Sequence, residues 1–257
     1  MSTGSVVFFH AHPDDEAIFT GGTMIALAEG GWRVVLVVAT QGELGNASEA
    51  LAAGPSLAAH RAAETRRAAD LLGVARVEFL GYQDSGMLGD PANSAPGAFW
   101  STATEAVAAD VAALLREERA VALVVYDERG IYGHPDHVKV HQVGVQAATQ
   151  AGTATVYEAT VDREYLHFVE THLVAEARGA GLPLGLAASP LGVPTVMVST
   201  TVDVRRALDA KRAAMAAHSS QIPETASAMR LPTEEFAAVY GYEWYLRHGP
   251  AGPIEAL

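Results

Sequence analysis

Apolar residues along the chain gather in short runs that alternate with longer, mixed segments. The runs are rich in Val, Phe, Leu and Thr, a composition typical of β-strands. We expect strands at 5–10, 33–40, 77–80, 121–127, 153–160 and 195–202. Several of these runs are apolar throughout and do not alternate with polar residues. This indicates strands that are buried on both faces of a sheet.

Segments with a helical pattern, many of them rich in Ala, fill the stretches between the strands. We expect helices at about 15–29, 57–73, 101–118, 136–150, 163–178, 203–218 and 233–247. The alternation predicts an α/β fold, a Rossmann-like parallel sheet flanked by helices. We interpret residues 1–178 as the core and residues 179–257 as completing the same domain with a small helical C-terminal subdomain. Stretches 82–98 and 179–194 are rich in Gly and Pro and predict loops.

The charge of the chain argues against a polyanionic partner. Its 257 residues carry a formal net charge of −13, and the 17 Lys and Arg residues form no basic block, so we expect no nucleic-acid binding. No apolar stretch approaches the roughly 20 residues of a membrane span. The N-terminal segment also lacks the features of a signal peptide. We therefore expect a cytoplasmic protein without a membrane partner. The chain has no cysteine, so thiolate metal ligands and disulfides are excluded.

The first expected strand is followed by a cluster of histidines and acids, AHPDDE at 11–16. Proline and acids are common at the start of a helix, because proline fits the first turn and acids complement the helix dipole. That explanation does not account for His12, or for a cluster at the carboxyl end of a buried strand, where α/β sheets bind ligands. The imidazole of His12 and the carboxylate of Asp15, three residues apart, can meet on one metal ion. Asp14 would then face the substrate.

A second His-Pro-Asp sequence, YGHPDH at 132–137, follows the strand expected at 121–127. It adds His134 and His137, each of which alone could be a structural residue of a turn or of a first helical turn. Two such turns at one sheet edge favour a shared function. Two histidines, one carboxylate and an open position for water are the ligand set of a catalytic zinc. We therefore predict a site for one zinc ion per chain, and Fe(II) fits the same ligands.

Together, AHPDDE and GHPDH resemble the motifs of the LmbE-like (PIG-L) zinc-dependent N-deacetylases. The segments QDSGM at 83–87, YDERGIYGHPDHVKVH at 126–141 and KRAAMAAHSSQ at 211–221 are most similar to the mycothiol-pathway branch of that family. That branch contains a deacetylase of an N-acetylglucosaminyl-inositol and an amidase of mycothiol S-conjugates. The resemblance implies hydrolysis of an N-acyl bond, most directly the acetamide of a glucosamine derivative.

The resemblance also implies roles for residues that match the family motifs. His12, Asp15 and His137 would hold the zinc. Asp14 would act as the general base on the attacking water. Elementary chemistry agrees, because zinc lowers the pKa of bound water to about 7 and a carboxylate next to a zinc ligand is within reach of that water.

Further matches imply how the intermediate and the substrate are held. Tyr132 would stabilise the oxyanion. His134 would assist the tetrahedral intermediate or protonate the leaving amine, and Asp136 would orient that imidazole. Arg61 and Asp84 match positions that hold sugar hydroxyls.

Two other functions stay open at this point. An amidase acting on a larger thiol conjugate would use the same chemistry, whereas a non-catalytic zinc- or sugar-binding protein would have no need of Asp14. Departures from the mycothiol enzymes, such as Phe19 after the first motif and Glu128 before the second, concern the substrate and leave the metal ligands intact. The expected partner is a small N-acetylated sugar or amide, and the sequence also allows a homo-oligomer.

Three more histidines and one glycine-containing segment are not assigned to the metal or to catalysis. We expect His10 to be a satisfied core histidine, and His141 to support the site without binding the metal. His218 matches a family position, and the sequence leaves open whether it faces the pocket. TQGELG at 40–45 lacks the spacing of a dinucleotide-binding motif, so we expect it to form a turn lining the pocket.

Overall fold

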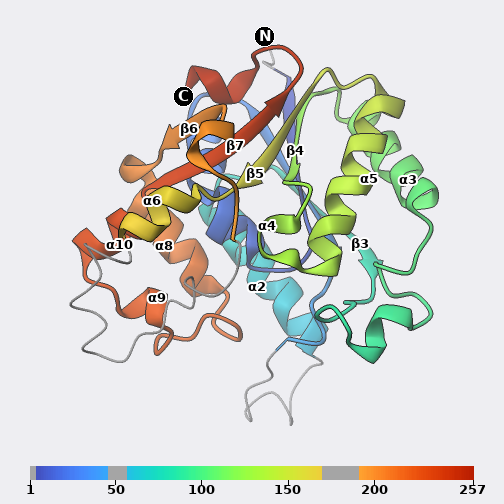
Figure 1. Cartoon of the computed structure of the whole chain (residues 1–257), viewed down its shortest axis with the longest axis horizontal. Helices are drawn as coiled ribbons and strands as arrows, with labels where there is room; N and C mark the ends of the chain where they lie inside the picture. Colours follow the sequence, from blue (N-terminus) through green and yellow to red (C-terminus); the bar gives the residue numbers. More distant parts are fainter. Residues whose placement is uncertain (1–3, 46–56, 170–190) are drawn as a thin grey trace.

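The computed structural model describes residues 4–45, 57–169 and 191–257. Its centre is a seven-stranded sheet with the strand order β3-β2-β1-β4-β5-β7-β6 (Figure 1). The strands are β1 (Ser5–His10), β2 (Arg33–Thr40), β3 (Arg76–Tyr82), β4 (Ala120–Tyr126), β5 (Thr155–Thr160), β6 (Thr200–Asp203) and β7 (Tyr242–His248). β1 lies in the interior of the sheet, so the turn after it is surrounded by neighbouring strands and loops.

Helices cover both faces of the sheet. α3 and α5 pack together on one face, and α1, α2 and α8 pack on the other (Figure 1). The helices are α1 (Gly21–Glu29), α2 (Leu57–Leu71), α3 (Thr104–Glu117), α4 (Gly130–Gly133), α5 (Pro135–Ala151), α6 (Arg163–Phe168), α8 (Leu208–Ala217), α9 (Ser227–Arg230) and α10 (Thr233–Tyr240). A π-helix, η1 (Glu16–Thr20), precedes α1, and short 3₁₀-helices are η3 (Pro91–Ser94), η6 (Thr195–Met197), η7 (Arg205–Ala207) and η8 (Pro253–Ala256).

The continuous apolar character of β1 follows from these two layers. Phe8 belongs to the core on the α1 face and Phe9 to the core on the α3 face, and both are fully buried. Burial of each such side chain contributes roughly 1.5–3 kcal/mol to the stability of the folded state. Because both faces of the strand are covered, its middle is apolar, and its two polar residues, Ser5 and His10, stand at its ends and are hydrogen-bonded.

The predicted α/β class is confirmed. β3, β2, β1, β4 and β5 pair in parallel, as the strand–helix alternation indicates. The last two strands differ from the expected parallel sheet, because β7 pairs antiparallel with both β5 and β6. The sheet is therefore mixed, with five parallel strands that carry the two motif turns.

Two element predictions near the end of the chain are wrong. The helix expected at 233–247 stops at Tyr240, and the residues Tyr242–His248 form β7. Their aromatic side chains and the pairing edge of β5 favour a strand there. The strand expected at 195–202 begins only at Thr200, because residues Thr195–Met197 form a 3₁₀-helix after Pro194.

β6, β7 and α8 all join the sheet or its helical layer, so this part of the chain packs on the core. The division into 1–178 and 179–257 stays a prediction, because its boundary lies outside the described residues, as do positions 170–178 of one expected helix and 179–190 of one expected loop. None of the helices in the described ranges is long and apolar enough to cross a membrane.

Candidate metal centre and active site

The first motif forms a tight turn at the carboxyl end of β1. The backbone N–H of His12 donates to the Asp15 carboxylate at 2.9 Å, which closes the turn. Asp14, between them, has φ 108°, a conformation that non-glycine residues rarely adopt. The backbone N–H groups of Ala17 and Ile18 donate to the Asp14 carbonyl and start the π-helix η1. The turn therefore separates two neighbouring carboxylates: Asp15 folds back on His12, and Asp14 points into a cavity.

The second motif comes after β4, at the end of a loop that is fixed by Asp127. This buried carboxylate accepts hydrogen bonds from the backbone N–H groups of Arg129 and Ile131 and from the hydroxyl of Thr160. The loop includes Ile131 at φ 64°. The loop leads into α5, where Pro135 occupies the first helical turn, a position that suits the fixed φ of proline.

The three predicted metal ligands, His12, Asp15 and His137, converge between these turns. The Asp15 Oδ2 atom lies 3.3 Å from His12 Nδ1 and 3.2 Å from His137 Nε2, and all three side chains are buried. One nitrogen from each of His12, His134 and His137 also lies within 4.8 Å of the other two. A buried carboxylate oxygen shared by two imidazole nitrogens is a donor set that fits a divalent cation. The cluster is thus able to hold a metal ion.

The carboxylate of Asp136 does not orient His134 as expected. Its Oδ2 accepts from the backbone N–H of Ser85 at 3.0 Å and lies 3.3 Å from His12 Nε2. Among the described residues, no hydrogen bond joins that carboxylate to His134. The backbone N–H of Asp136 donates instead to His134 Nδ1 at 3.1 Å, the helix-capping bond of α5. Because Nδ1 accepts, a neutral His134 carries its proton on Nε2.

A cavity of about 340 Å³ opens over the cluster. It is lined by several predicted site residues: His12, Asp14, Asp15, Arg61, Asp84, Tyr132 and His134. The prediction that the turn at 40–45 lines the pocket is confirmed, since Leu44 and Gly45 belong to the lining. Gly86, Met87 and Asp90 also line it and were not among the predicted site residues, although they lie in the loop predicted at 82–98. The QDSGM segment at 83–87 was the sequence signal for the first two.

The two residues expected to bind sugar hydroxyls both reach this cavity and already have protein partners. Arg61 is buried and donates to the carbonyls of Gly42 at 2.6 Å and Pro13 at 2.5 Å, and it lies 3.4 Å from the Asp14 carboxylate. Asp84 accepts from the backbone N–H of Gly86. Arg61 therefore ties the turn of the first motif to the turn at 40–45.

The sequence of this site is shared with a known protein family. The family model described as "PIG-L: GlcNAc-PI de-N-acetylase" matches residues 7–148, more than half of the chain and both motifs. The chain belongs to the PIG-L family. The predicted resemblance is confirmed, and so is the predicted enzyme class, a hydrolase that removes N-acyl groups.

Relatives of this PIG-L protein match almost end to end. A protein of Thermobispora bispora, named 1D-myo-inositol 2-acetamido-2-deoxy-alpha-D-glucopyranoside deacetylase, is 36% identical and the match covers 98% of this chain and 91% of the relative. A relative of the same name from Nocardia farcinica is 38% identical, with coverage of 98% and 94%. Among solved structures, N,N'-diacetylchitobiose deacetylase from Pyrococcus horikoshii shares the fold, with a TM-score of 0.63, 23% identity, and coverage of 96% of this chain and 84% of that one.

The two neighbouring carboxyl groups of this PIG-L site differ in acidity. Burial, followed by repulsion from Asp15, raises the pKa of Asp14 to about 7. Burial acts in the same direction on Asp15, but the imidazoles of His137 and His12 outweigh it and hold the pKa of Asp15 well below its usual range. Burial, followed by the other two imidazoles, lowers the pKa of His134 to about 4. Environments that push the pKa values of adjacent groups apart are typical of acid–base sites.

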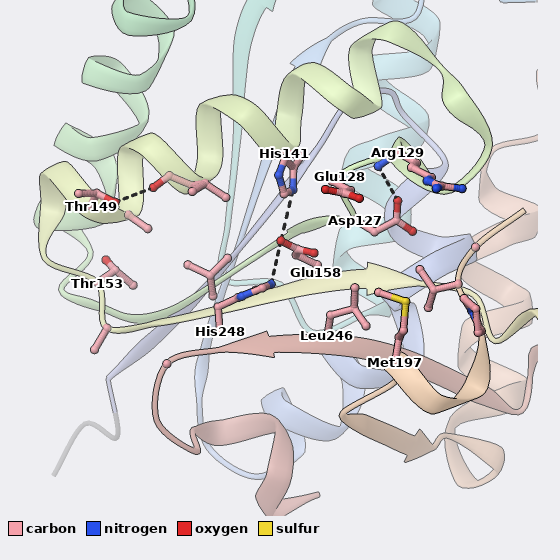
Figure 2. Close-up of a pocket in the computed structure, with 18 of the residues that line it drawn as sticks. Asp127, Glu128, Arg129, His141, Thr149, Thr153, Glu158, Met197, Leu246 and His248 are labelled. Carbon is pink, nitrogen blue, oxygen red and sulfur yellow. Dashed lines mark hydrogen bonds and ion pairs between the residues drawn. The ribbon is translucent and has the colours of Figure 1, made fainter.

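Two further histidines lie outside the cavity. His10 is a satisfied core histidine as predicted, bonded to the hydroxyls of Tyr126 and Thr20 at 2.9 Å each. His141 lies against the carbonyl of Tyr126 and against Glu158, in keeping with the supporting role expected for it. Figure 2 shows His141 and His248 on either side of Glu158 in a second, larger cavity, which shares no lining residue with the first.

His218 is fully buried and does not line the cavity over the metal cluster. Its Nε2 atom lies 2.6 Å from the carboxylate of Glu16, which is also fully buried. The question left open by the sequence is thereby answered: His218 faces the interior beneath the first motif.

Proposed function

We propose that this protein removes the N-acetyl group of an N-acetylglucosamine derivative with one zinc ion held by His12, Asp15 and His137. The observation that carries the proposal is the Asp15 oxygen shared by two buried imidazoles, directly below a cavity that Asp14 enters. Two imidazoles and one carboxylate leave a position for water or substrate, which is typical of catalytic zinc sites. Fe(II) fits the same ligands.

Zinc at such a site supplies a Lewis acid and lowers the pKa of bound water to about 7. Asp14 is then the base that takes the proton from the attacking water, because it is the cavity-facing carboxylate next to a ligand. Its strained turn directs it away from the ligand cluster and toward the substrate.

Tyr132 and His134 stand where charge develops in the substrate. The Tyr132 hydroxyl lies 3.4 Å from His137 Nε2, at the edge of the cluster. With that nitrogen bound to the proposed metal, the hydroxyl proton would be available to an oxyanion. One such donor contributes about 3–4 kcal/mol to transition-state binding. His134 carries its proton on Nε2 when neutral, because its Nδ1 accepts a backbone N–H, and this N–H donates a hydrogen bond to the tetrahedral intermediate. His134 would protonate the leaving amine only as the imidazolium, after receiving the proton that Asp14 takes from the water.

The substrate class rests on the cavity and on the relatives. A volume of about 340 Å³ is small for a ligand site and suits one sugar ring. Asp84 and Arg61 line it and are the groups proposed to hold hydroxyls of that ring. Relatives that are 33–38% identical are named as deacetylases of a 2-acetamido-glucopyranoside linked to inositol, which favours an inositol aglycone here.

The test is acetate release from a panel of N-acetylglucosaminides by metal-free enzyme and by enzyme with one equivalent of zinc. The panel includes an inositol-linked sugar and a thiol-conjugate amide. We expect metal-dependent release, fastest from the inositol-linked member. Cleavage of the thiol conjugate alone would replace the deacetylase with an amidase, and full zinc binding without any release would leave a binding protein.

Variants of three histidines test the ligand set. We expect His12→Ala and His137→Ala to lose both bound zinc and turnover. His141→Ala is the matched control, because His141 lies one turn along α5 from His137 and outside the cluster. Metal content is measured on the purified variants. Retention of one zinc by His137→Ala would refute the ligand set.

A further inference from the structure

A buried pair of side chains lies directly beneath the first motif and takes no part in the chemistry above. Glu16 and His218 are both fully buried, and they come from positions 202 residues apart in the chain. Glu16 begins the π-helix η1, and His218 caps the end of α8. π-helical turns are rare and occur frequently at functional sites. A buried charged group of this kind needs partners, so its contacts indicate what it holds in place.

The Glu16 carboxylate bridges two groups with its two oxygens. Oε2 accepts the backbone N–H of Asp14 at 3.0 Å, and Oε1 accepts from His218 Nε2 at 2.6 Å. Asp14 is the residue with φ 108°, which costs of the order of 1–3 kcal/mol and persists only where the surroundings fix it. The bond from Asp14 to Glu16 is a contact of that kind, made by the strained residue itself.

His218 is in turn fixed by its own backbone. Its N–H donates to the Met215 carbonyl, and its carbonyl accepts from the N–H groups of Gln221 and Ile222. The backbone that carries the imidazole is thus fixed, and the side chain itself is fully buried, so the imidazole has little room to move away from the Glu16 carboxylate. A chain of contacts runs from the end of α8 through Glu16 to the backbone of Asp14.

We propose that Glu16 and His218 are positioning residues for Asp14: they hold its backbone in the strained conformation that directs its carboxylate into the cavity. The inference rests on the proposed function, in which Asp14 is the base, but its structural part concerns Asp14 alone. Neither residue lines the cavity.

The chain offers a matched control in Glu64. This carboxylate is also fully buried and is held by the two residues after His218, through the Ser220 N–H at 2.8 Å and the hydroxyls of Ser219 and Ser220. Within the described part of the chain, no hydrogen bond or ion pair joins it to Asp14. Glu64→Gln therefore perturbs the same region without changing the contacts from His218 through Glu16 to Asp14.

The first readout is hydrogen exchange of the Asp14 backbone N–H, measured by NMR. Glu16→Gln keeps the shape of the side chain but leaves only one acceptor oxygen for two donors. We expect exchange at Asp14 to become at least about 10-fold faster in Glu16→Gln, because a local opening costs less there. Glu64→Gln leaves this rate unchanged. His218→Gln, whose amide still donates to Glu16, keeps most of the protection, and His218→Leu loses it.

The second readout is kinetic. We expect Glu16→Gln to lower kcat by about 10–100-fold, as for partners that orient catalytic groups, with bound metal retained. The KM of Glu16→Gln stays within about threefold of the wild-type value, since the proposed sugar contacts are intact. In an Asp14→Ala background the same Glu16 substitution has no further effect, because a residue that acts through Asp14 cannot act without it.

The outcomes separate the two proposals. Unchanged exchange at Asp14 in Glu16→Gln overturns the positioning role whether or not the enzyme turns over any amide. An equal kinetic loss in Glu64→Gln, or a full loss from Glu16→Gln on top of Asp14→Ala, overturns it as well. If the wild-type protein shows no turnover but the exchange differences are as expected, the proposed function is refuted and the positioning role of Glu16 and His218 is supported.

Discussion

The same three residues, His-Pro-Asp, occur in two turns of this protein and do different work in each. In the first turn the aspartate, Asp14, is strained and faces the cavity, and the histidine, His12, lies in the buried cluster. In the second turn the aspartate, Asp136, is fully buried against His12 and does not line the cavity. The histidine, His134, lines the cavity as His12 does, and it also caps α5.

The difference comes from the residues that come after each turn. Asp15 closes the first turn with its carboxylate, and the residue before it has an unusual backbone conformation. The second turn enters a regular helix at once, so its aspartate has helical geometry and points inward. A short motif thus specifies chemistry only together with the elements on its two sides.

The two aspartates are expected to differ most in their effect on turnover. Asp14→Ala lowers kcat by about 1,000-fold while the metal stays bound, because only the base is lost. Asp136→Ala acts through the fold. It leaves the Ser85 N–H without its acceptor, which costs about 1–3 kcal/mol, and it weakens metal affinity by about 10–100-fold through His12. Metal titration, kinetics and urea unfolding of the two variants measure the difference.

If Asp14→Ala lost its metal, or if Asp136→Ala kept full stability and metal affinity, the contrast between the two aspartates would be wrong. Asp14→Asn and Asp136→Asn serve as controls for side-chain volume. The first is expected to resemble Asp14→Ala in rate, since an amide is not a base.

A smaller effect, on stability, concerns two glycines of the second turn. Gly130 and Gly133 both have positive φ, but a Cβ at Gly130 would lie 2.6 Å from the Cβ of His137, and one at Gly133 would meet nothing within 4 Å. Gly133→Ala is expected to cost about 1 kcal/mol from backbone strain. Gly130→Ala adds the clash, for a total of about 2–4 kcal/mol, and it weakens metal binding by displacing His137. Equal unfolding free energies for the two variants would contradict the close approach.

The weakest of these effects comes from strain in the first turn. Glycine adopts positive φ readily, so Asp14→Gly is expected to be more stable than Asp14→Ala by about 1 kcal/mol. Both variants lack the proposed base, so the difference in stability between them isolates the backbone. Thermal unfolding of the two proteins side by side measures it. A less stable glycine variant would mean that Asp14 is not strained in solution.

The sequence predicted the parts of the site that depend on local pattern. Buried strands ending in His-Pro-Asp place both turns at one sheet edge, and the structure has them there, with Asp15 between His12 and His137. Contacts made across the fold were not accessible in this way. The partners of Asp136 include Ser85, 51 residues away, and those of Glu16 include His218, 202 residues away, and no local pattern announces either pairing.

The same limit explains the missed strand β7. Its sequence carries Glu243, which is unusual in a buried strand. The charge is balanced by Lys211 at 2.7 Å, and the carboxylate accepts hydrogen bonds from the backbone N–H groups of Gly22 and Thr23 and from the Tyr245 hydroxyl. Without those distant partners, residues 233–247 have the pattern of one continuous helix.

β7 is synthesised late, although it contacts the start of α1. The Tyr245 hydroxyl bonds to Thr23, 222 residues earlier in the chain, so this contact can form only after Tyr245 has been synthesised, roughly 10–45 s after Thr23. During that interval the backbone N–H groups of Gly22 and Thr23 have no carboxylate to meet, and β5, once it has been made, has an unpaired edge until β7 follows. The sheet of the nascent chain therefore stays incomplete until β7 has been synthesised, and unpaired strand edges of this kind are prone to aggregation.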